Sequence, residues 1–168
     1  MRYRLTEYSS NEFVTFELNK EAGETRSVCL NMSWRLSVRN KVIWPEYTHD
    51  RRGVNLWRST CLEIFLGQPG ASGYLEINLS PSGAWNAYSF TSYREGMAET
   101  DRVRLVGLQR GTNAFEARLQ FDTLPMPITV GPAAVIEKES GALSYFALKH
   151  GDKPDFHNAA LHQRLDHL

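Results

Sequence analysis

The chain has 168 residues, of which 42% are hydrophobic and 11% aromatic, and its 19 basic residues balance 19 acidic ones. This length predicts a single domain over residues 1–168, because domains cluster near ~100–150 residues. The zero formal charge excludes a polybasic nucleic-acid-binding protein, and no apolar run reaches the ~20 residues of a membrane span. The N-terminus lacks the apolar region of a secretory signal, so we expect a cytoplasmic protein.

Apolar and polar residues alternate with a period of two along most of the chain, and this pattern predicts β-strands. In chain order the alternating segments are 14–18, 28–38, 62–66, 75–79, 103–108, 115–121 and 143–148. The longest segment places Leu30 and Trp34 on one face and Asn31 and Ser33 on the other. We therefore assign Trp34 to the hydrophobic core.

The turns between these segments support the same interpretation. Proline cannot donate a hydrogen bond to a β ladder, and we expect all seven prolines to lie between strands, at Pro45, Pro69, Pro81, Pro125, Pro127, Pro132 and Pro154. The pattern predicts an all-β fold, an antiparallel β-sandwich of the jelly-roll type with at most one or two short helices. One such helix is expected over 159–165, with Asn158 as its N-cap.

Two further features complete the organisation of the chain. Cys29 and Cys61 lie in predicted strands without the spacing of a redox pair or a zinc site, so we expect both to be reduced. The segment 44–57 contains Trp44 and Trp57 and has no periodicity. A long loop of this kind on a β scaffold is either functional or a variable surface loop.

A pair of carboxylates faces away from the predicted core. Leucine and isoleucine alternate inward in the segments 62–66 and 75–79, so Glu63 and Glu76 point outward. If the turn over residues 67–73 makes these two strands neighbours, the two carboxylates lie close together. Such a pair can serve a glycosidase, bind sugar hydroxyls or a cation, or form ion pairs with outward arginines such as Arg118.

Four of the five histidines lie near the C-terminus, at His150, His157, His162 and His167. Metal ligation on a helix favours histidines four residues apart, whereas the last three are five apart, so no metal ligand is assigned. The irregular segment 150–157 is either a functional polar segment or contains an ordinary loop histidine. No P-loop, nucleophile elbow or dinucleotide-binding motif is present, and no catalytic residue is assigned.

Four segments resemble the DOMON-like superfamily, whose relatives include the family 9 carbohydrate-binding modules. They are LWRSTCLEIFL at 56–66, GYLEINLSPSGAW at 73–85, FTSYREGM at 90–97 and KPDFH at 153–157. The last two are similar to a stand-alone bacterial group of this superfamily. The resemblance implies a β-sandwich jelly roll whose members bind sugars or haem and are not usually catalytic.

The sugar-binding relatives place a tryptophan six positions before a strand glutamate, as Trp57 and Glu63 are spaced here. Asn78 on the following strand resembles their polar lining. These relatives use a second tryptophan from late in the domain to sandwich the sugar. No tryptophan follows Trp85 in this chain, and Phe156 is the nearest aromatic substitute.

These observations lead to the hypothesis of a non-catalytic binding domain for a small carbohydrate or related polar metabolite. Trp57 is expected to stack on the ligand, and Glu63, Asn78 and Arg94 to hydrogen-bond it. The full set of expected ligand-binding residues is Trp57, Glu63, Glu76, Asn78, Trp85, Arg94, Phe156 and His157. The expected partner is a sugar-like small molecule, without nucleic acid, membrane or cofactor.

Two alternatives stay open. One is a glycan-active hydrolase or isomerase that uses Glu63 and Glu76. The other is a haem-binding or metal-binding DOMON-type domain, with haem or calcium as the cofactor. Met97 with His150 or His157 matches the haem ligands of such relatives by residue type alone.

Overall fold

The computed structural model describes residues 1–21, 27–38 and 41–168. Its strands are β1 (Arg2–Glu7), β2 (Phe13–Lys20), β3 (Val28–Ser37), β4 (Arg51–Arg52), β5 (Cys61–Gly67), β6 (Tyr74–Leu79), β7 (Ala84–Phe90), β8 (Ala98–Glu99), β9 (Val103–Arg110), β10 (Ala114–Phe121), β11 (Ile128–Glu137), β12 (Leu143–Ala147) and β13 (Gln163–Leu165). Two short 3₁₀ turns, η1 (Leu56–Arg58) and η2 (Ala159–Leu161), are the helical elements of these ranges. Within them, no helix is long and apolar enough to cross a membrane.

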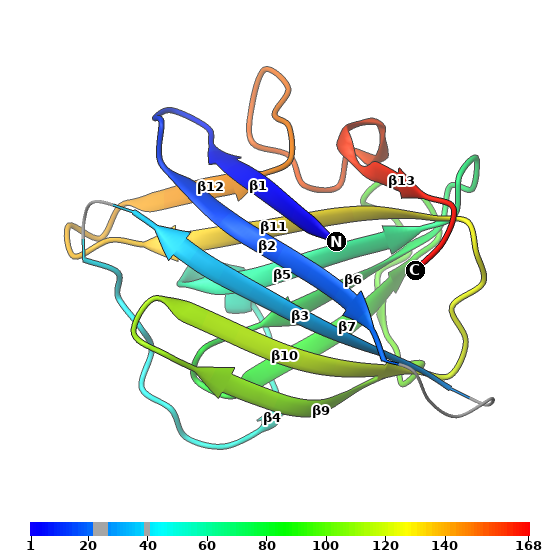
Figure 1. Cartoon of the computed structure of the whole chain (residues 1–168), viewed down its shortest axis with the longest axis horizontal. Coiled ribbons are helices and arrows are strands. Elements are labelled where there is room, and N and C mark those ends of the chain that lie inside the picture. The colour runs from blue at the N-terminus through cyan, green and yellow to red at the C-terminus, as the bar shows by residue number, and fades with distance from the viewer. Residues whose placement is uncertain (22–26, 39–40) are drawn as a thin grey trace.

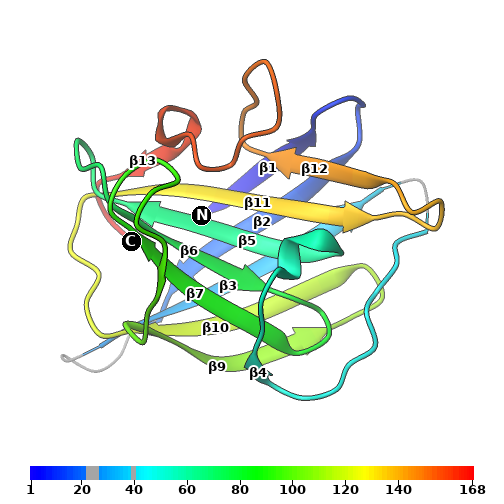
Figure 2. The ribbon, with the colours of Figure 1, turned by 180° about the vertical axis from the view of Figure 1, so that it is seen from behind.

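The strands form one sheet that curls over on itself (Figures 1 and 2). Its order is β4-β7-β6-β5-β11-β12-β1-β2-β3-β10-β9, with β13 on β11 and β8 on β7. We call β1, β2, β3, β10 and β9 the β3 half, and β12, β11, β5, β6, β7 and β4 the β5 half; Figure 1 shows the β3 half in front. The all-β prediction is confirmed. The predicted jelly-roll sandwich is not, because pairing between β1 and β12 joins the two halves into a continuous half-barrel.

The hydrophobic core lies between the two halves. Trp34 on β3 is fully buried, with its ring centroid 4.9 Å from that of Phe16 and 6.1 Å from that of Phe115. Ile64 and Ile77 are the buried counterparts on the β5 half. The predicted alternation is therefore confirmed, and burial of side chains of this size stabilises the fold by about 1.5–3 kcal/mol each.

One proline contradicts the sequence prediction. Pro132 lies inside β11, opposite Ile64 on β5, although all prolines were expected between strands. On its other edge, β11 pairs with β13 up to Val130 and with β12 from Ala133 onward. Pro132 stands where one partner strand gives way to the next, so a residue without an N–H group is tolerated in a central strand.

The predicted C-terminal helix over 159–165 is also wrong beyond its first turn. The Asn158 side chain does cap the chain, since its Oδ1 accepts a hydrogen bond from the N–H of Ala160 at 3.1 Å. The chain then extends as β13, which pairs with β11 and buries Leu165 in the core. Burial of this leucine and the ladder hydrogen bonds outweigh the helical pattern of the sequence.

The segment 44–57 crosses the edge of the β5 half. Its two-residue strand β4 pairs in parallel with β7. Gly83 permits this close approach, because its φ is 92° and a Cβ there would lie 2.7 Å from the carbonyl oxygen of His49. The segment ends at η1, which carries Trp57 to the outward face of the β5 half.

Candidate ligand-binding site

A pocket of about 480 Å³ lies on the outward face of the β5 half. It is lined by Trp57, Glu63, Phe65, Glu76, Phe90, Arg94, Met97, Val135, Tyr145, Pro154, Phe156 and His157. Strands β5, β6, β7, β11 and β12 form its floor, and η1, the segment 91–97 and the segment 150–157 form its walls. Its volume lies within the range of about 300–1,000 Å³ that is typical of small-molecule sites.

Strand alternation brings the polar side chains to this floor. Glu63 lies directly opposite Asn78 across the β5–β6 ladder, and Phe65 lies opposite Glu76. The predicted pairing of these two strands, with both carboxylates on one face, is confirmed. The face is covered rather than solvated, since Glu63 is only 3% exposed and Glu76 only 7%. The alternative ion pair with Arg118 is wrong, because that side chain lies on the β3 half and pairs with Glu21.

Burial controls the ionisation of the two carboxyl groups. It raises the pKa of Glu63 well above its usual value, and the nearby charge of Glu76 raises it further. Burial also raises the pKa of Glu76, against a hydrogen bond from Asn78 Nδ2 at 2.7 Å that favours the ionised form. The Cys61 thiol, free and buried beside Glu63, likewise has its pKa raised well above normal by burial. The floor is thus an apolar setting in which carboxyl groups resist ionisation.

Two buried side-chain oxygen atoms on the outward face of β5 and β6 have no hydrogen-bond partner among the described residues. They are Oε1 of Glu63 and Oδ1 of Asn78. Buried polar side-chain atoms usually have a partner, because leaving one unsatisfied costs about 1–3 kcal/mol. The unpartnered Glu63 oxygen, on a residue that lines the pocket, is suited to a ligand hydrogen-bond donor.

A chain of hydrogen bonds connects the wall to the floor. The Tyr74 hydroxyl accepts from the backbone N–H of Arg94 at 3.2 Å and lies 2.7 Å from Nδ1 of His157. Burial, and then the charge of Arg94, lower the pKa of His157 to about 4, so its ring is neutral near pH 7. We assign the Tyr74 proton to His157 Nδ1 and the ring proton to Nε2, which lies 3.8 Å from Oε2 of Glu76.

The wall itself is held by a second set of contacts. The Arg94 guanidinium forms an ion pair with Asp155 at 2.9 Å, and the Tyr93 hydroxyl also donates to this carboxylate. Burial opposes ionisation, but the Tyr93 and Arg94 hydrogen bonds keep the pKa of Asp155 below its usual value. Arg94 adopts a left-handed backbone with φ of 58°, a strained conformation outside glycine that is common at functional sites.

Aromatic side chains line the space above the carboxyl groups. Phe65 is 1% exposed, and its ring centroid lies 5.0 Å from that of His157 and 6.4 Å from that of Phe156. Trp57 is 48% exposed at the rim and presents a flat apolar face. The pocket therefore combines an aromatic wall with a polar floor.

The structure brings together six of the eight predicted ligand-binding residues: Trp57, Glu63, Glu76, Arg94, Phe156 and His157. Asn78 shares the face of Glu63 and Glu76 but does not line the pocket, and its Nδ2 donates a hydrogen bond to Glu76. Trp85 lies outside this pocket, because it packs against the hydrophobic core with the Arg52 guanidinium 4.0 Å from its ring.

Several lining residues were not predicted. Phe65 was the one with a clear sequence signal, since it shares the outward face of β5 with Glu63. Val135 and Tyr145 lie on β11 and β12, and their place depends on which strands become neighbours. Among the residues that the structure describes, no group of three or more His, Cys, Asp or Glu is arranged to hold a metal ion.

Comparisons with known proteins give one structural neighbour. No family model and no curated protein sequence matches the chain. The fold is similar to a crystal structure from Bacteroides uniformis of a protein described as a "putative carbohydrate-binding protein". The TM-score is 0.61 at 13% identity, over 98% of this chain and 84% of that chain. This similarity supports the fold, and the resemblance to the DOMON-like superfamily stays a prediction.

Proposed function

We propose that the protein is a non-catalytic binding domain for a small carbohydrate or a related polar metabolite. The observation that carries this proposal is the pocket on the β5 half, where an aromatic wall faces two buried carboxyl groups. Aromatic rings pack against the apolar faces of a sugar ring, and carboxyl oxygens accept hydrogen bonds from its hydroxyl groups. The carbohydrate-binding description of the Bacteroides uniformis protein agrees with this ligand class.

The location of the pocket also supports a DOMON-like assignment, which is part of the proposal. All four segments that carry the resemblance border it. The segment 56–66 supplies Trp57 and Glu63, 73–85 supplies Glu76, 90–97 supplies Arg94, and 153–157 supplies His157. Segments far apart in the sequence thus share one location on the β5 half.

A pair of carboxyl groups in one pocket is also the machinery of a glycosidase. A glycosidase needs one carboxyl group that is protonated and another that is ionised, so their environments must push the two pKa values apart. Here burial raises the pKa of both Glu63 and Glu76. We propose that these groups bind a ligand, and release of sugar from a glycan substrate by the purified protein would overturn this choice in favour of a glycan-active hydrolase.

A thermal-shift screen with mono- and disaccharides tests the proposal. A ligand at about 100 times its Kd stabilises a protein by ~2.7 kcal/mol, which raises the melting temperature of a domain of this size by about 5–10 °C. We expect such a shift from at least one sugar, and we expect Trp57→Ala to abolish it without lowering the melting temperature of the free protein. Tyr47→Ala is the matched control, since Tyr47 is 50% exposed in the same segment but does not line the pocket.

The proposal fails if no sugar in the screen raises the melting temperature. It also fails in its choice of site if Trp57→Ala binds as tightly as the wild type, or if Tyr47→Ala weakens binding to the same extent.

A further inference from the structure

The floor of the pocket has an excess of hydrogen-bond acceptors when Glu63 is ionised. Glu63 is 3% exposed and lines the pocket, and its Oε1 has no partner among the described residues. The amide nitrogen of Asn78 does not reach this oxygen, because it donates to Oε1 of Glu76 at 2.7 Å. Asn78 Oδ1, directly opposite Glu63 in the β5–β6 register, is a second buried acceptor without a partner. Asn78 does not line the pocket, so the acceptor that a ligand donor can reach is that of Glu63.

The same floor lacks a positive charge of its own. The charges of Glu63 and Glu76 oppose each other when both are ionised. The cation of the wall, Arg94, is paired with Asp155 at 2.9 Å, and its charge only partly offsets the effect of burial on the pKa of Glu76. His157 is neutral near pH 7, so its contact with Glu76 is not an ion pair. Burial favours the neutral form of Glu63 in the free protein, and a cationic ligand group would favour its ionised form by supplying the compensating charge.

We propose that the ligand is a sugar with a free primary amine, and that its ammonium group binds between Glu63 and Glu76. An ammonium group has three hydrogen-bond donors and a positive charge, which are the two properties that the floor lacks. The sugar ring then packs against the aromatic wall at Trp57 and Phe156. This inference rests on the proposed function and names the ligand class for the same pocket.

Matched pairs of sugars test the inference. The ¹⁵N-labelled protein is titrated at pH 6.5 with D-glucosamine and D-glucose, D-galactosamine and D-galactose, and D-mannosamine and D-mannose. We expect at least one amino sugar to bind about tenfold or more tightly than its parent hexose, which is the usual gain from a charged hydrogen bond. N-acetylation of that amino sugar should remove the preference, because it removes the charge.

Substitution of the floor carboxyl groups tests the assignment to residues. Glu63→Gln should lose the preference for the amino sugar, because the amide keeps the size of the side chain and cannot ionise when the ammonium group binds. Glu116→Gln on β10 is the matched control, an exposed glutamate on the β3 half that should keep the preference. If thermal melting shows that Glu63→Gln does not fold, Glu76→Gln provides the same test.

The outcomes separate the two proposals. If a hexose binds but no amino sugar binds more tightly than its parent hexose, the amine assignment is overturned and the carbohydrate-binding function stands. If neither member of any pair shifts the amide signals of the pocket, both are overturned for hexoses. A preference that survives in the folded glutamine variant overturns the role of the substituted carboxyl group.

Discussion

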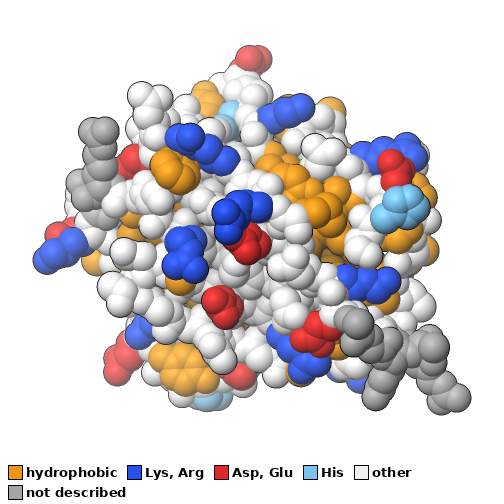
Figure 3. Space-filling model, in the orientation of Figure 1, with side chains coloured by type: hydrophobic (Ala, Val, Ile, Leu, Met, Phe, Trp, Pro, Cys, Tyr) orange, Lys and Arg blue, Asp and Glu red, His pale blue; other side chains and the backbone are white. Residues whose placement is uncertain are grey.

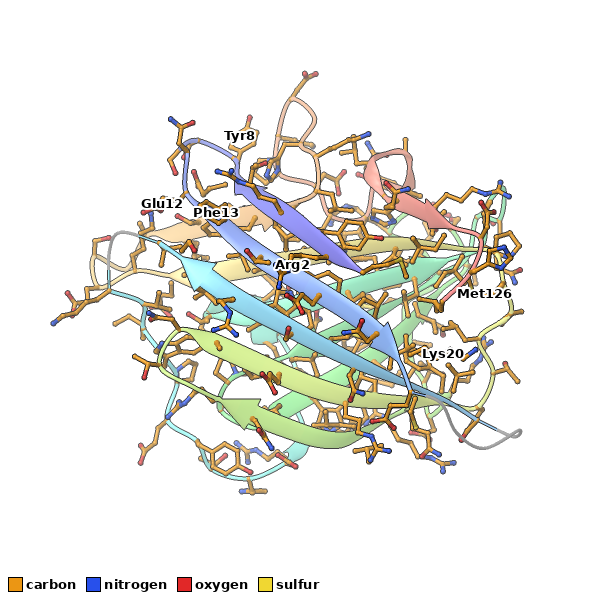
Figure 4. The ribbon with its side chains drawn as sticks, in the orientation of Figure 1. Arg2, Tyr8, Glu12, Phe13, Lys20 and Met126 are labelled. Carbon is orange, nitrogen blue, oxygen red and sulfur yellow. The ribbon has the colours of Figure 1, made fainter. Side chains whose placement is uncertain are left out.

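The two halves of the sheet follow the same alternation of residues but differ in what covers their outward faces. On the β3 half, Arg118 pairs with Glu21 at 2.6 Å and Arg2 with Glu17 at 2.5 Å. Figure 3 shows blue and red side chains side by side across this face, and Figure 4 shows Arg2 among its strands. On the β5 half, η1 and the segments 91–97 and 150–157 cover the outward face, so Glu63 is buried.

This difference determines the chemistry of each face. Each half carries a hollow of similar size, about 460 Å³ on the β3 half and about 480 Å³ on the β5 half. The first is lined mainly by polar side chains such as Asn19, Gln109 and Arg118, which are exposed. Water satisfies such groups at little cost, whereas burial shifts the pKa of groups in the second hollow. The two hollows therefore differ because η1 and the segments 91–97 and 150–157 cover the one on the β5 half.

The largest expected effect comes from Phe65, which belongs to the aromatic wall of the pocket on the β5 half. Phe65→Ala should lower the free energy of unfolding by about 3–5 kcal/mol, although Phe65 faces away from the main core, because it is buried among aromatic rings. The comparison is Val106→Ala on β9, 45% exposed, with an expected change within about 0.5 kcal/mol. Urea unfolding of both variants measures the difference; equal small effects would contradict the account of a covered face.

The next largest effect is the contribution of His157 to the pH dependence of the free energy of unfolding. Its pKa is about 4 in the folded protein and near the ordinary 6.5 when unfolded, so the unfolded chain takes up a proton first as the pH falls. The stability of the wild type relative to His157→Gln should therefore decrease by up to about 3 kcal/mol between pH 7 and pH 4. Urea unfolding across this range measures the change. The exposed His49→Gln is the control, and parallel profiles for wild type and His157→Gln would refute the burial of this ring.

Glycine-to-alanine substitutions should also affect the two halves differently, because His162 lies very close to Gly131 on β11. A Cβ at Gly131 would overlap the ring of His162, whose Nε2 lies 2.8 Å from the carbonyl oxygen of Phe156. Gly131→Ala should thus displace the covering segment and cost about 1–3 kcal/mol of stability. At Gly107 on β9 a Cβ would lie 3.8 Å from that of Arg118, an ordinary contact. Gly107→Ala should change stability by about 0.5 kcal/mol or less, and thermal melting that ranks the two variants in the opposite order would contradict this packing.

The smallest expected effect concerns one hydroxyl group. Tyr74→Phe removes the hydrogen bonds to His157 and to the Arg94 backbone, and it should cost about 1–2 kcal/mol in urea unfolding. Tyr3→Phe on the β3 half is the matched control, since its hydroxyl contacts only the exposed Met1 sulfur among the described residues, and should change stability by a few tenths of a kcal/mol. A cost for Tyr3→Phe as large as that for Tyr74→Phe would remove the distinction between the two faces.

The sequence predicted on which face of a strand each side chain lies, but it did not predict which segments cover that face. The period-two pattern placed Trp34 on the core-facing side of its strand. It also placed Glu63 and Glu76 on the sides of their strands that face away from the core. Both predictions were possible because alternation is a local property of the backbone. The burial of these carboxyl groups depends on segments such as 150–157, which are distant in the sequence. Tyr145 could not be assigned to the site for the same reason, since the neighbours of its strand are set by long-range pairing.

Some local predictions were wrong because tertiary pairing overrides local preference. The spacing of Leu161 and Leu165 favoured a helix, yet pairing of β13 with β11 extends this segment. Pro132 was expected in a turn, yet it lies in β11 at the change of partner strand. Neither outcome has a signal in the adjacent residues, since both depend on where β11 meets strands from elsewhere in the chain.

The most direct test of the account is an NMR map of sugar binding on the ¹⁵N-labelled protein. A binding mono- or disaccharide should shift the amide signals around Glu63, Glu76 and Arg94, which belong to the covered pocket of the β5 half. Shifts concentrated instead around Asn31 and Glu116, in the hollow of the β3 half, would contradict the choice of site. An absence of shifts on both faces would contradict carbohydrate binding itself.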